Sequence, residues 1–328
     1  MSDKIICERN LSEEYPHISR EILDLYDASF RDAMDENYED SLEKLKIVSQ
    51  YEIAEARFAL GLMYFSAQGT PRNFPEALRL FKLCVESGHT HSNLYLGEIY
   101  LNGWGVERDT NEAMRYFIEA ARNDDARACY LLGSMLIDPD LGYNNYDLAV
   151  HAFTQGAQSD HPESCHRLGL LYSNGEGVEQ NLELANSLFE IAADQGYAYS
   201  QFCLGQSYEY GRGTPQDKLK AIYWYEKAAR QNIAQAQHNL AATMMNTLQY
   251  EDCIDQAIFW FEKAASQNMG LSMLSLYNIY RQGQGVPVNE EKWRYWLKQA
   301  ELSQDSYAQQ GVEMAILNDY SAINTLPA

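Results

Sequence analysis

The sequence predicts an all-α solenoid built from two-helix units that follow one another along the chain. Three observations lead to this prediction: leucine recurs every 36 residues along most of the chain, small and aromatic residues recur at the same step, and turn-forming residues separate the helical stretches. A period of this length indicates a repeat architecture, in which each unit buries its apolar face only against its neighbours.

The first helix of each unit is marked by a leucine column, whose members are Leu60, Leu96, Leu132, Leu168, Leu204, Leu240 and Leu276. A small residue lies four positions earlier, at Ala56, Ser92, Ala128, Ser164, Ser200, Ala236 and Ser272. Apolar residues spaced three and four apart form one stripe on a helix. This spacing therefore predicts a helix with one apolar face in every unit.

A glycine column follows the leucines, with the members Gly61, Gly97, Gly133, Gly169 and Gly205. Glycine inside a helix costs about 1 kcal/mol relative to alanine, so five glycines in register need a structural reason. We expect a close approach of the second helix at an alanine column, Ala77, Ala113, Ala149, Ala185, Ala221 and Ala257. An aromatic column has the same step: Phe81, Phe117, Phe153, Phe189, Tyr225 and Phe261.

The second helix is bounded by capping residues. Its start is predicted at Asn73, Asp109, Asn145, Asn181, Asp217, Cys253 and Asn289, and all but the cysteine can accept a hydrogen bond from a first-turn amide. Asp252 is the expected cap beside Cys253. Its end is predicted at residues that tolerate a left-handed backbone: Gly88, Asp124, Asp160, Gly196, Asn232 and Asn268.

A G-x-G turn is predicted between the two helices of a unit. It occurs at Gly103–Gly105, Gly175–Gly177, Gly211–Gly213 and Gly283–Gly285. The turn is altered in the other units, at Ala67–Gly69, Pro139–Leu141 and Thr247–Gln249.

The periodicity divides the chain into an N-terminal tail, a degenerate first unit, seven recognisable units, and a C-terminal capping helix with a tail: 1–19, 20–55, 56–307 and 308–328. In the degenerate unit, Asn37 and Leu45 keep the register of the second helix, whereas Asp24 and Leu25 stand where leucine and glycine are expected. Beyond the last full unit, Val312 keeps the register and indicates a capping helix.

The charge restricts the classes of partner. The 328 residues include 25 basic and 47 acidic side chains, so the formal net charge is 25 − 47 = −22. Such a surface repels phosphate, which makes nucleic acid and anionic membranes poor partners. It steers a basic protein toward the chain; the alternative is that the charge only keeps the protein soluble. No apolar run of about 18 residues occurs, so we expect no membrane span.

The cysteines and the first residues favour a cytoplasmic protein. The opening segment MSDKIICERNLSEEYPHISR has no apolar stretch long enough for a signal peptide. The six cysteines show no paired motif. We therefore expect reduced thiols that fill the core.

No catalytic, cofactor-binding or metal-binding constellation is recognisable in the sequence. The G-x-G pairs lack the strand and the Lys-Ser/Thr of a phosphate-binding loop. His89 and His91 have no further ligands at a suitable spacing, and the adjacent Cys165 and His166 diverge by about 100° on a helix. We expect neither enzyme activity nor a cofactor.

Three segments carry a resemblance to a known family: LGEIYLNGWGVERDTNEAMRYFIEAA, LGLLYSNGEGVEQNLELANSLFEIAADQG and LGQSYEYGRGTPQDKLKAIYWYEKAA. They resemble Sel1-like repeats, which are similar to tetratricopeptide repeats with a longer turn between the helices. The resemblance covers Ala54 to Ala300 and implies a right-handed superhelix whose first helices line a concave face. Cysteine-rich members with a disulfide in each repeat are associated with penicillin binding or hydrolysis. This chain lacks that pairing, so we do not expect that activity.

The register of the related repeats implies a partner-binding surface on the concave face. The residues expected there are Phe58, Leu62, Phe65, Leu94, Glu98, Tyr130, His166, Tyr199, Phe202, Glu209, Tyr210 and His238. An exposed apolar patch usually marks a partner site. The alternative is that these side chains pack between successive first helices as core. Trp104 is a separate candidate contact, or else it covers its own unit.

The expected function, implied mainly by the resemblance, is that of an adaptor or scaffold that binds another protein through the concave face. The alternative, which the resemblance also implies, is a stoichiometric inhibitor that neutralises a basic toxic effector, in the manner of immunity proteins with such repeats. The net charge of −22 suits this alternative without establishing it.

Overall fold

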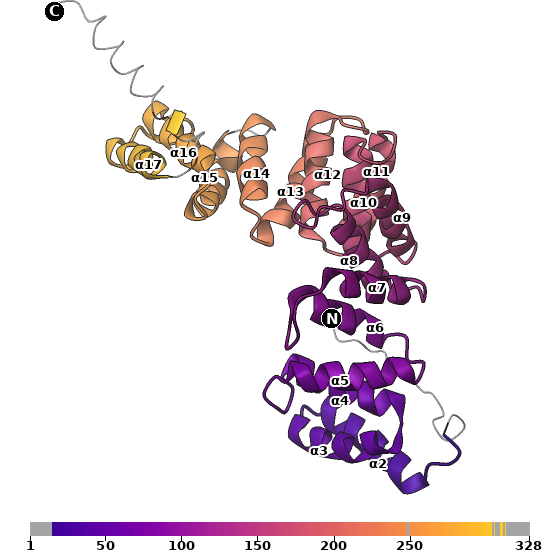
Figure 1. The fold of residues 1–328 in the computed structure, drawn as a ribbon. Helices are drawn as coiled ribbons and strands as arrows, with labels where there is room; N and C mark the ends of the chain where they lie inside the picture. Colours follow the sequence, from indigo (N-terminus) through magenta and orange to yellow (C-terminus); the bar gives the residue numbers. More distant parts are fainter. Residues whose placement is uncertain (1–14, 248–249, 304, 306–308, 311, 313–328) are drawn as a thin grey trace, which may run out of the picture. The chain divides into compact units, whose positions relative to one another are not determined.

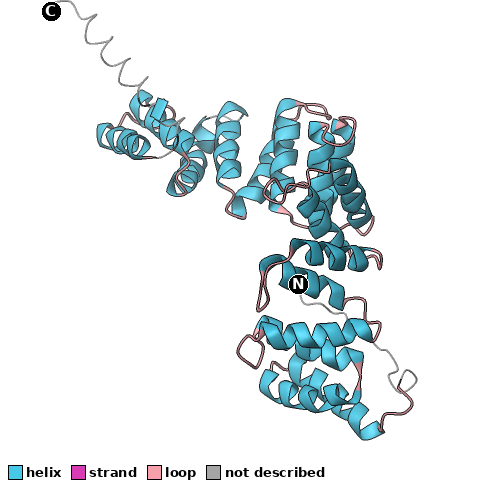
Figure 2. Cartoon of the chain, viewed as in Figure 1, coloured by secondary structure: helices cyan, strands magenta, loops and turns pink. Residues whose placement is uncertain are grey.

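The computed structural model describes residues 15–247, 250–303, 305, 309–310 and 312, and within them every regular element is a helix (Figure 2). The chain is an all-α solenoid, as predicted. It divides into two compact units, residues 1–159 and 160–328. No helix among the described residues is long and apolar enough to cross a bilayer.

The described residues of unit 1 form four helix pairs, which can be followed in Figure 1. Its elements are α2 (Arg20–Met34), α3 (Tyr38–Val48), the short 3₁₀ helix η1 (Ser49–Tyr51), α4 (Ala54–Ser66), α5 (Phe74–Glu86), α6 (Ser92–Asn102), α7 (Thr110–Ala121), α8 (Ala126–Leu136) and α9 (Tyr146–Ala157). The even-numbered helices are the first helices of the pairs. The pair α2 and α3 occupies the place of the degenerate unit, and its buried Leu23, Tyr26 and Leu45 pack in one cluster with Ala56 and Leu60 of α4.

Unit 2 has the same alternation of first and second helices (Figure 1). Its elements are α10 (Pro162–Asn174), α11 (Leu182–Asp194), α12 (Ala198–Tyr210), α13 (Lys218–Arg230), α14 (Ala234–Thr247), α15 (Tyr250–Ser266), α16 (Gly270–Gln282) and α17 (Glu290–Leu302). Val312 is buried against the cluster formed by α14 to α17. Most of the predicted capping helix and tail lies outside the described residues, as does most of the N-terminal tail.

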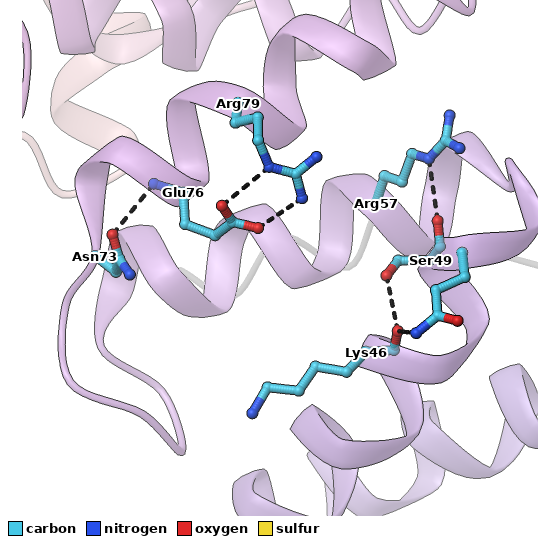
Figure 3. A network of polar contacts seen from close by, with 7 residues as sticks. Lys46, Ser49, Arg57, Asn73, Glu76 and Arg79 are labelled. Atoms are coloured by element: carbon cyan, nitrogen blue, oxygen red, sulfur yellow. Dashed lines mark hydrogen bonds and ion pairs between the residues drawn. The ribbon is translucent and has the colours of Figure 1, made fainter.

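The predicted caps at the start of the second helices are confirmed in six units. Asn73 accepts a hydrogen bond at 3.2 Å from the amide of Glu76, whose carboxylate pairs with Arg79 (Figure 3). The equivalent caps form on five other second helices, at Asp109, Asn145, Asn181, Asp217 and Asn289. Each cap satisfies amides that have no partner inside the helix.

The predicted start of α15 is wrong. This helix already runs from Tyr250, so neither Cys253 nor Asp252 lies at its first position. The helix begins earlier in its repeat than the other second helices do, so Cys253 lies within it. Its side chain is 1% exposed and packs in the core. Two residues of the altered turn, 248 and 249, lie outside the described part of the chain.

The predicted left-handed residues after the second helices are confirmed at all six positions. The φ angles are positive at Gly88, Asp124, Asp160, Gly196, Asn232 and Asn268. Asparagine and aspartate adopt this region more readily than other residues with a side chain. Each second helix therefore ends at a defined residue, which keeps the repeat length constant.

The glycine column lies against the second helix, as expected, and its nearest neighbours are the rings of the aromatic column; at Gly169 the backbone oxygen of Ala185 is also close, 3.2 Å from the position of a Cβ atom. A Cβ atom on Gly169 would lie 2.6 Å from Cε1 of Phe189, and one on Gly205 would lie 2.4 Å from Cδ1 of Tyr225. The aromatic residue lies four positions, about one helical turn, after the alanine of the second helix, and its ring packs against the glycine of the first helix. In these five units the missing Cβ atom leaves room for the ring, so the column sets the distance between their paired helices.

Buried glutamines connect successive pairs in unit 2, which the sequence analysis missed. Gln237 is 2% exposed and donates to the carbonyl of Ala229 at 3.2 Å, and its side-chain oxygen accepts from Gln267 at 2.8 Å. Gln201 and Gln231 repeat this arrangement one unit earlier. The spacing of 36 residues within each pair of equivalent glutamines is the signal that could have revealed the link.

Four cysteines fill core positions, as predicted. Cys84, Cys129, Cys165 and Cys253 are buried, whereas Cys203 is partly buried. Burial raises the pKa of the Cys84, Cys129 and Cys165 thiols to about 11, so these groups are protonated and unreactive at neutral pH. Cys7 lies outside the described residues.

The variant Gly169→Leu is expected to lower the free energy of unfolding by about 3 kcal/mol, since its side chain has no room beside Phe189. Glu190→Leu introduces the same side chain at an exposed position of the neighbouring α11 and serves as the control. Urea denaturation followed by circular dichroism measures both. Equal midpoints for the two variants would show that the glycine column does not set the helix spacing.

The variant Gln237→Leu is expected to destabilise the chain by about 1–3 kcal/mol, because it removes a buried hydrogen bond to the carbonyl of Ala229 and a part-buried one from Gln267. Gln256→Leu makes the same change at an exposed position on α15. Thermal and urea unfolding of both variants tests the link. A loss of stability that is no larger for Gln237→Leu would exclude it.

Candidate partner-binding surface

In unit 1, much of the predicted surface is packed inside the protein. Phe58, Leu94 and Glu98 are 9%, 4% and 7% exposed. The ring of Phe58 lies 4.5 Å from that of His89 and 5.5 Å from that of Tyr95, centroid to centroid. The ring contacts therefore join helices α4 and α6. A partner could reach little of these side chains unless the two helices moved apart.

The remaining members in unit 1 are half-buried: Leu62, Phe65 and Tyr130. Phe65 packs edge-on against Phe74 and against Trp104, at 5.6 and 5.5 Å between centroids. Trp104 in turn stacks on Phe74 at 5.0 Å with 13° between the ring planes. Phe74 begins the second helix of the preceding pair, so Trp104 packs on the previous unit as well as against the cluster that contains its own unit.

The buried Glu98 is held by a charged partner on the next first helix. Its Oε1 lies 2.5 Å from Nη2 of Arg127, which lies in the first turn of α8. Burial raises the pKa of the Glu98 carboxyl, and Arg127 opposes that shift. Beside them, Asp125 caps α8 by accepting from the amide of Ala128 and lies 3.7 Å from His91. Glu98 is thus a link between α6 and α8.

In unit 2, two histidines of the predicted surface form equivalent hydrogen bonds. Nδ1 of His166 lies 2.9 Å from Oγ of Ser200, and Nδ1 of His238 lies 2.9 Å from Oγ of Ser272. Burial lowers the pKa of His166 to about 4 and lowers that of His238 as well. Both imidazoles are therefore neutral at neutral pH and act as struts between successive first helices.

The serines of the small-residue column all bond to a histidine. Ser92 and Ser164 lie 2.9 and 3.1 Å from Nδ1 of His89 and His161, which precede them by three residues. Ser200 and Ser272 bond to histidines that precede them by 34 residues. The signal for these contacts in the sequence is a serine in the small-residue column with a histidine three or 34 residues before it. Ser200 is fully buried, so the Ser–His pair offers no accessible nucleophile.

Glu209 is the acidic residue of the predicted surface in unit 2, and both of its carboxylate oxygens are bonded inside the chain. Oε2 accepts from the hydroxyl of Tyr225 at 2.7 Å, and Oε1 accepts from that of Thr243 at 3.1 Å. Burial and the nearby Glu209 raise the pKa of Tyr225. Asn239 donates to the same tyrosine hydroxyl at 3.3 Å. The carboxylate thus connects α12, α13 and α14.

Two of the twelve predicted residues are exposed, and both lie on α12. Tyr199 is 54% and Tyr210 is 62% exposed. They stand near opposite ends of the helix, about 16 Å apart along its axis. Phe202 between them is half-buried and packs on Tyr225 at 5.9 Å between centroids. The ring of Tyr199 lies 6.2 Å from that of His166. An exposed tyrosine at each end of a well-braced helix is thus what this surface offers a partner.

The described residues contain no cluster of three or more histidine, cysteine or acidic side chains that could hold a metal. A hollow of about 410 Å³ lies at the start of α3 beside Glu36, Glu39 and Asp40. A smaller one of about 230 Å³ lies between α11, α12 and the turn at Gly213. Neither contains any of the predicted surface residues.

Comparison with known proteins identifies the repeats. The family model of the Sel1 repeat matches seven consecutive segments: 54–89, 90–125, 126–161, 162–197, 198–233, 234–269 and 270–303. No curated protein sequence matches the chain.

Among solved structures, the chain is similar to c5321 of uropathogenic Escherichia coli, a protective antigen that displays an SLR fold, with 25% identity over 88% of this chain and 70% of that one and a TM-score of 0.61. A Sel1 repeat protein from Oxalobacter formigenes is 26% identical over 84% of this chain and 80% of that one, also with a TM-score of 0.61. Because the matched repeats fill more than half of the sequence, the chain belongs to the Sel1 repeat family.

Proposed function

We propose that this protein is an adaptor or scaffold that binds another protein through the first-helix surface of its repeats. The observation that supports this most directly is the pair of exposed tyrosines on α12, Tyr199 and Tyr210. Tyrosine provides a large apolar area with a polar end and is enriched at interface positions that dominate binding energy. Repeat proteins of this type generally serve as protein-interaction modules.

The side chains around the two tyrosines favour a preorganised surface. His166 and Glu209 are held by hydrogen bonds to neighbouring first and second helices. A helix that is fixed before binding loses little conformational freedom on contact with a partner. The buried members of the predicted surface therefore support recognition by bracing the exposed ones.

A basic partner remains part of the proposal, on the strength of the net charge of −22. The negative charge is not concentrated on the first helices of unit 2. These helices carry two acidic residues, Glu163 and Glu209, and two basic residues, Arg167 and Arg281. Electrostatic attraction would thus act over a distance and speed the encounter, while the tyrosines hold the partner at contact. A reducing compartment such as the cytoplasm suits the thiols that fill the core.

The second candidate function is stoichiometric inhibition of a basic toxic effector, which the same net charge favours. The two functions differ in what happens to the partner. An adaptor leaves the activity of its partner intact, whereas an inhibitor abolishes it at a ratio of one to one.

The double variant Tyr199→Ala/Tyr210→Ala is expected to stay folded and to dissociate at least tenfold faster from the natural partner, because it removes the exposed anchors. The partner is first isolated by affinity capture with the wild-type chain and identified by mass spectrometry. Surface plasmon resonance then compares the double variant with Leu148→Ala, which truncates an exposed apolar residue on α9. Unchanged dissociation by a folded double variant would exclude α12 as the binding surface.

The variant Glu209→Gln is expected to lower the free energy of unfolding by about 1–3 kcal/mol. The glutamine side chain has only one oxygen, which is uncharged, so it cannot take the place of both carboxylate oxygens that accept the hydrogen bonds from the two hydroxyl groups. Tyr210→Ala, one position along the same helix, should leave stability within about 0.5 kcal/mol of wild type because its side chain is exposed. Equal unfolding midpoints for the two variants would mean that Glu209 does not brace the surface.

A further inference from the structure

Three exposed aromatic side chains recur on the second helices at the end of unit 2. Tyr223, Phe259 and Tyr295 lie on α13, α15 and α17, 36 residues apart, and are 51%, 48% and 54% exposed. We call them the aromatic row. The equivalent exposed positions of the earlier second helices carry polar or charged residues: Arg79, Arg115, His151 and Ser187. Helix packing in this fold therefore does not require an aromatic side chain at that position.

Each ring of the aromatic row is held by the tryptophan that follows it. The pairs Tyr223–Trp224, Phe259–Trp260 and Tyr295–Trp296 have edge-to-face contacts with 5.0, 5.0 and 4.9 Å between ring centroids. Trp224 is 7% exposed, and the other two tryptophans are partly buried against the core. The exposed rings are thus fixed in place before any contact, which reduces the entropy lost on binding.

Basic side chains accompany the row. Nζ of Lys227 lies 4.5 Å from the ring centre of Tyr223 and 4.6 Å from that of Trp224. Nζ of Lys263 lies 5.6 Å from the ring centre of Phe259. These are cation–π distances, and they place positive charge directly beside the exposed rings.

The basic character is strongest on α13. This helix carries one acidic residue, Glu226, and four basic residues, Lys218, Lys220, Lys227 and Arg230. Leu219, which is 64% exposed, adds an apolar side chain close to Tyr223 on the same side of the helix. In a protein with a net charge of −22, α13 is therefore a local basic and apolar surface.

We propose that the aromatic row, together with the basic residues of α13, is a second docking surface for an acidic protein segment that carries apolar side chains. Carboxylates of such a segment would pair with Lys220 and Lys227, since Arg230 already pairs with Glu226, and its apolar side chains would pack on the rings. This surface lies on second helices, and the proposal does not depend on the first-helix surface. Two surfaces with different partners would allow the protein to bring two proteins together.

The charge distribution favours a short acidic segment over the other occupants. Surface charges are screened beyond about 8 Å at physiological ionic strength, so carboxylates of a short segment that lie over α13 respond mainly to that helix. The helix α15 carries four acidic residues and one lysine, so it offers the segment only its exposed ring. A nucleic acid extends far beyond α13 and would be repelled by the remaining acidic surface. A second copy of this chain brings its own charge of −22 to the encounter and is disfavoured for the same reason.

The test is a selection of random 12-residue displayed peptides against the immobilised full-length chain. Enriched peptides are expected to combine several aspartates or glutamates with phenylalanine, tryptophan or leucine. A synthetic enriched peptide should bind the variant Tyr223→Ala/Phe259→Ala/Tyr295→Ala at least tenfold more weakly than wild type. Ser187→Ala, at the equivalent position of α11, and the double variant Tyr199→Ala/Tyr210→Ala should bind it as wild type does.

A charge-reversal variant, Lys220→Glu/Lys227→Glu, keeps all three rings and provides an independent measurement if the triple variant does not fold. It should also weaken binding at least tenfold at low salt, with a smaller effect at high salt. The proposal is overturned by a selection that enriches no peptides or basic ones, or by peptide binding that survives both variants. It is equally overturned if sedimentation shows a dimer that the charge-reversal variant disrupts, since the occupant is then a second copy.

Discussion

The contact between a glycine on the first helix and an aromatic ring on the second is the constraint on which the repeat depends. With a Cβ atom at Gly169 or Gly205, the ring opposite would be closer than van der Waals contact allows. The helices of a pair can therefore approach only where glycine and the ring coincide, 20 residues apart in the sequence. That coincidence recurs in five successive units, from Gly61 to Gly205, and sets the geometry of those pairs; Ala241 and Tyr277 occupy the position in the last two.

Polar side chains in the core connect one pair to the next. The glutamine links in unit 2, the bonds of His166 to Ser200 and of His238 to Ser272, and the Glu98–Arg127 pair all join neighbouring helices. A buried polar group without a partner is costly, so these residues stabilise one relative placement of the pairs against others. They also account for most of the polar residues that the sequence had suggested as contacts for a partner.

The exposed aromatic residues proposed as partner contacts fall on two kinds of helix in unit 2. Tyr199 and Tyr210 lie on a first helix, and the aromatic row lies on second helices. The two surfaces differ in their charged neighbours: α12 carries a single acidic residue already bonded inside the chain, whereas α13 is rich in lysine. This difference gives each surface its own preference for a partner.

The sequence by itself determined the helical fold, the repeat length, the caps of six second helices and the left-handed residues that end them. These features follow from local rules of backbone conformation and from periodic burial, which act over a few residues and are visible in one chain. What it could not determine was which side of a first helix stays exposed. Phe58 and Tyr199 both fall in or beside register positions of the predicted surface, yet one is 9% and the other 54% exposed. Exposure depends on what the neighbouring unit places opposite, as when His89 and Tyr95 cover Phe58. Such contacts join residues about 30 to 40 positions apart, and only the tertiary structure decides them.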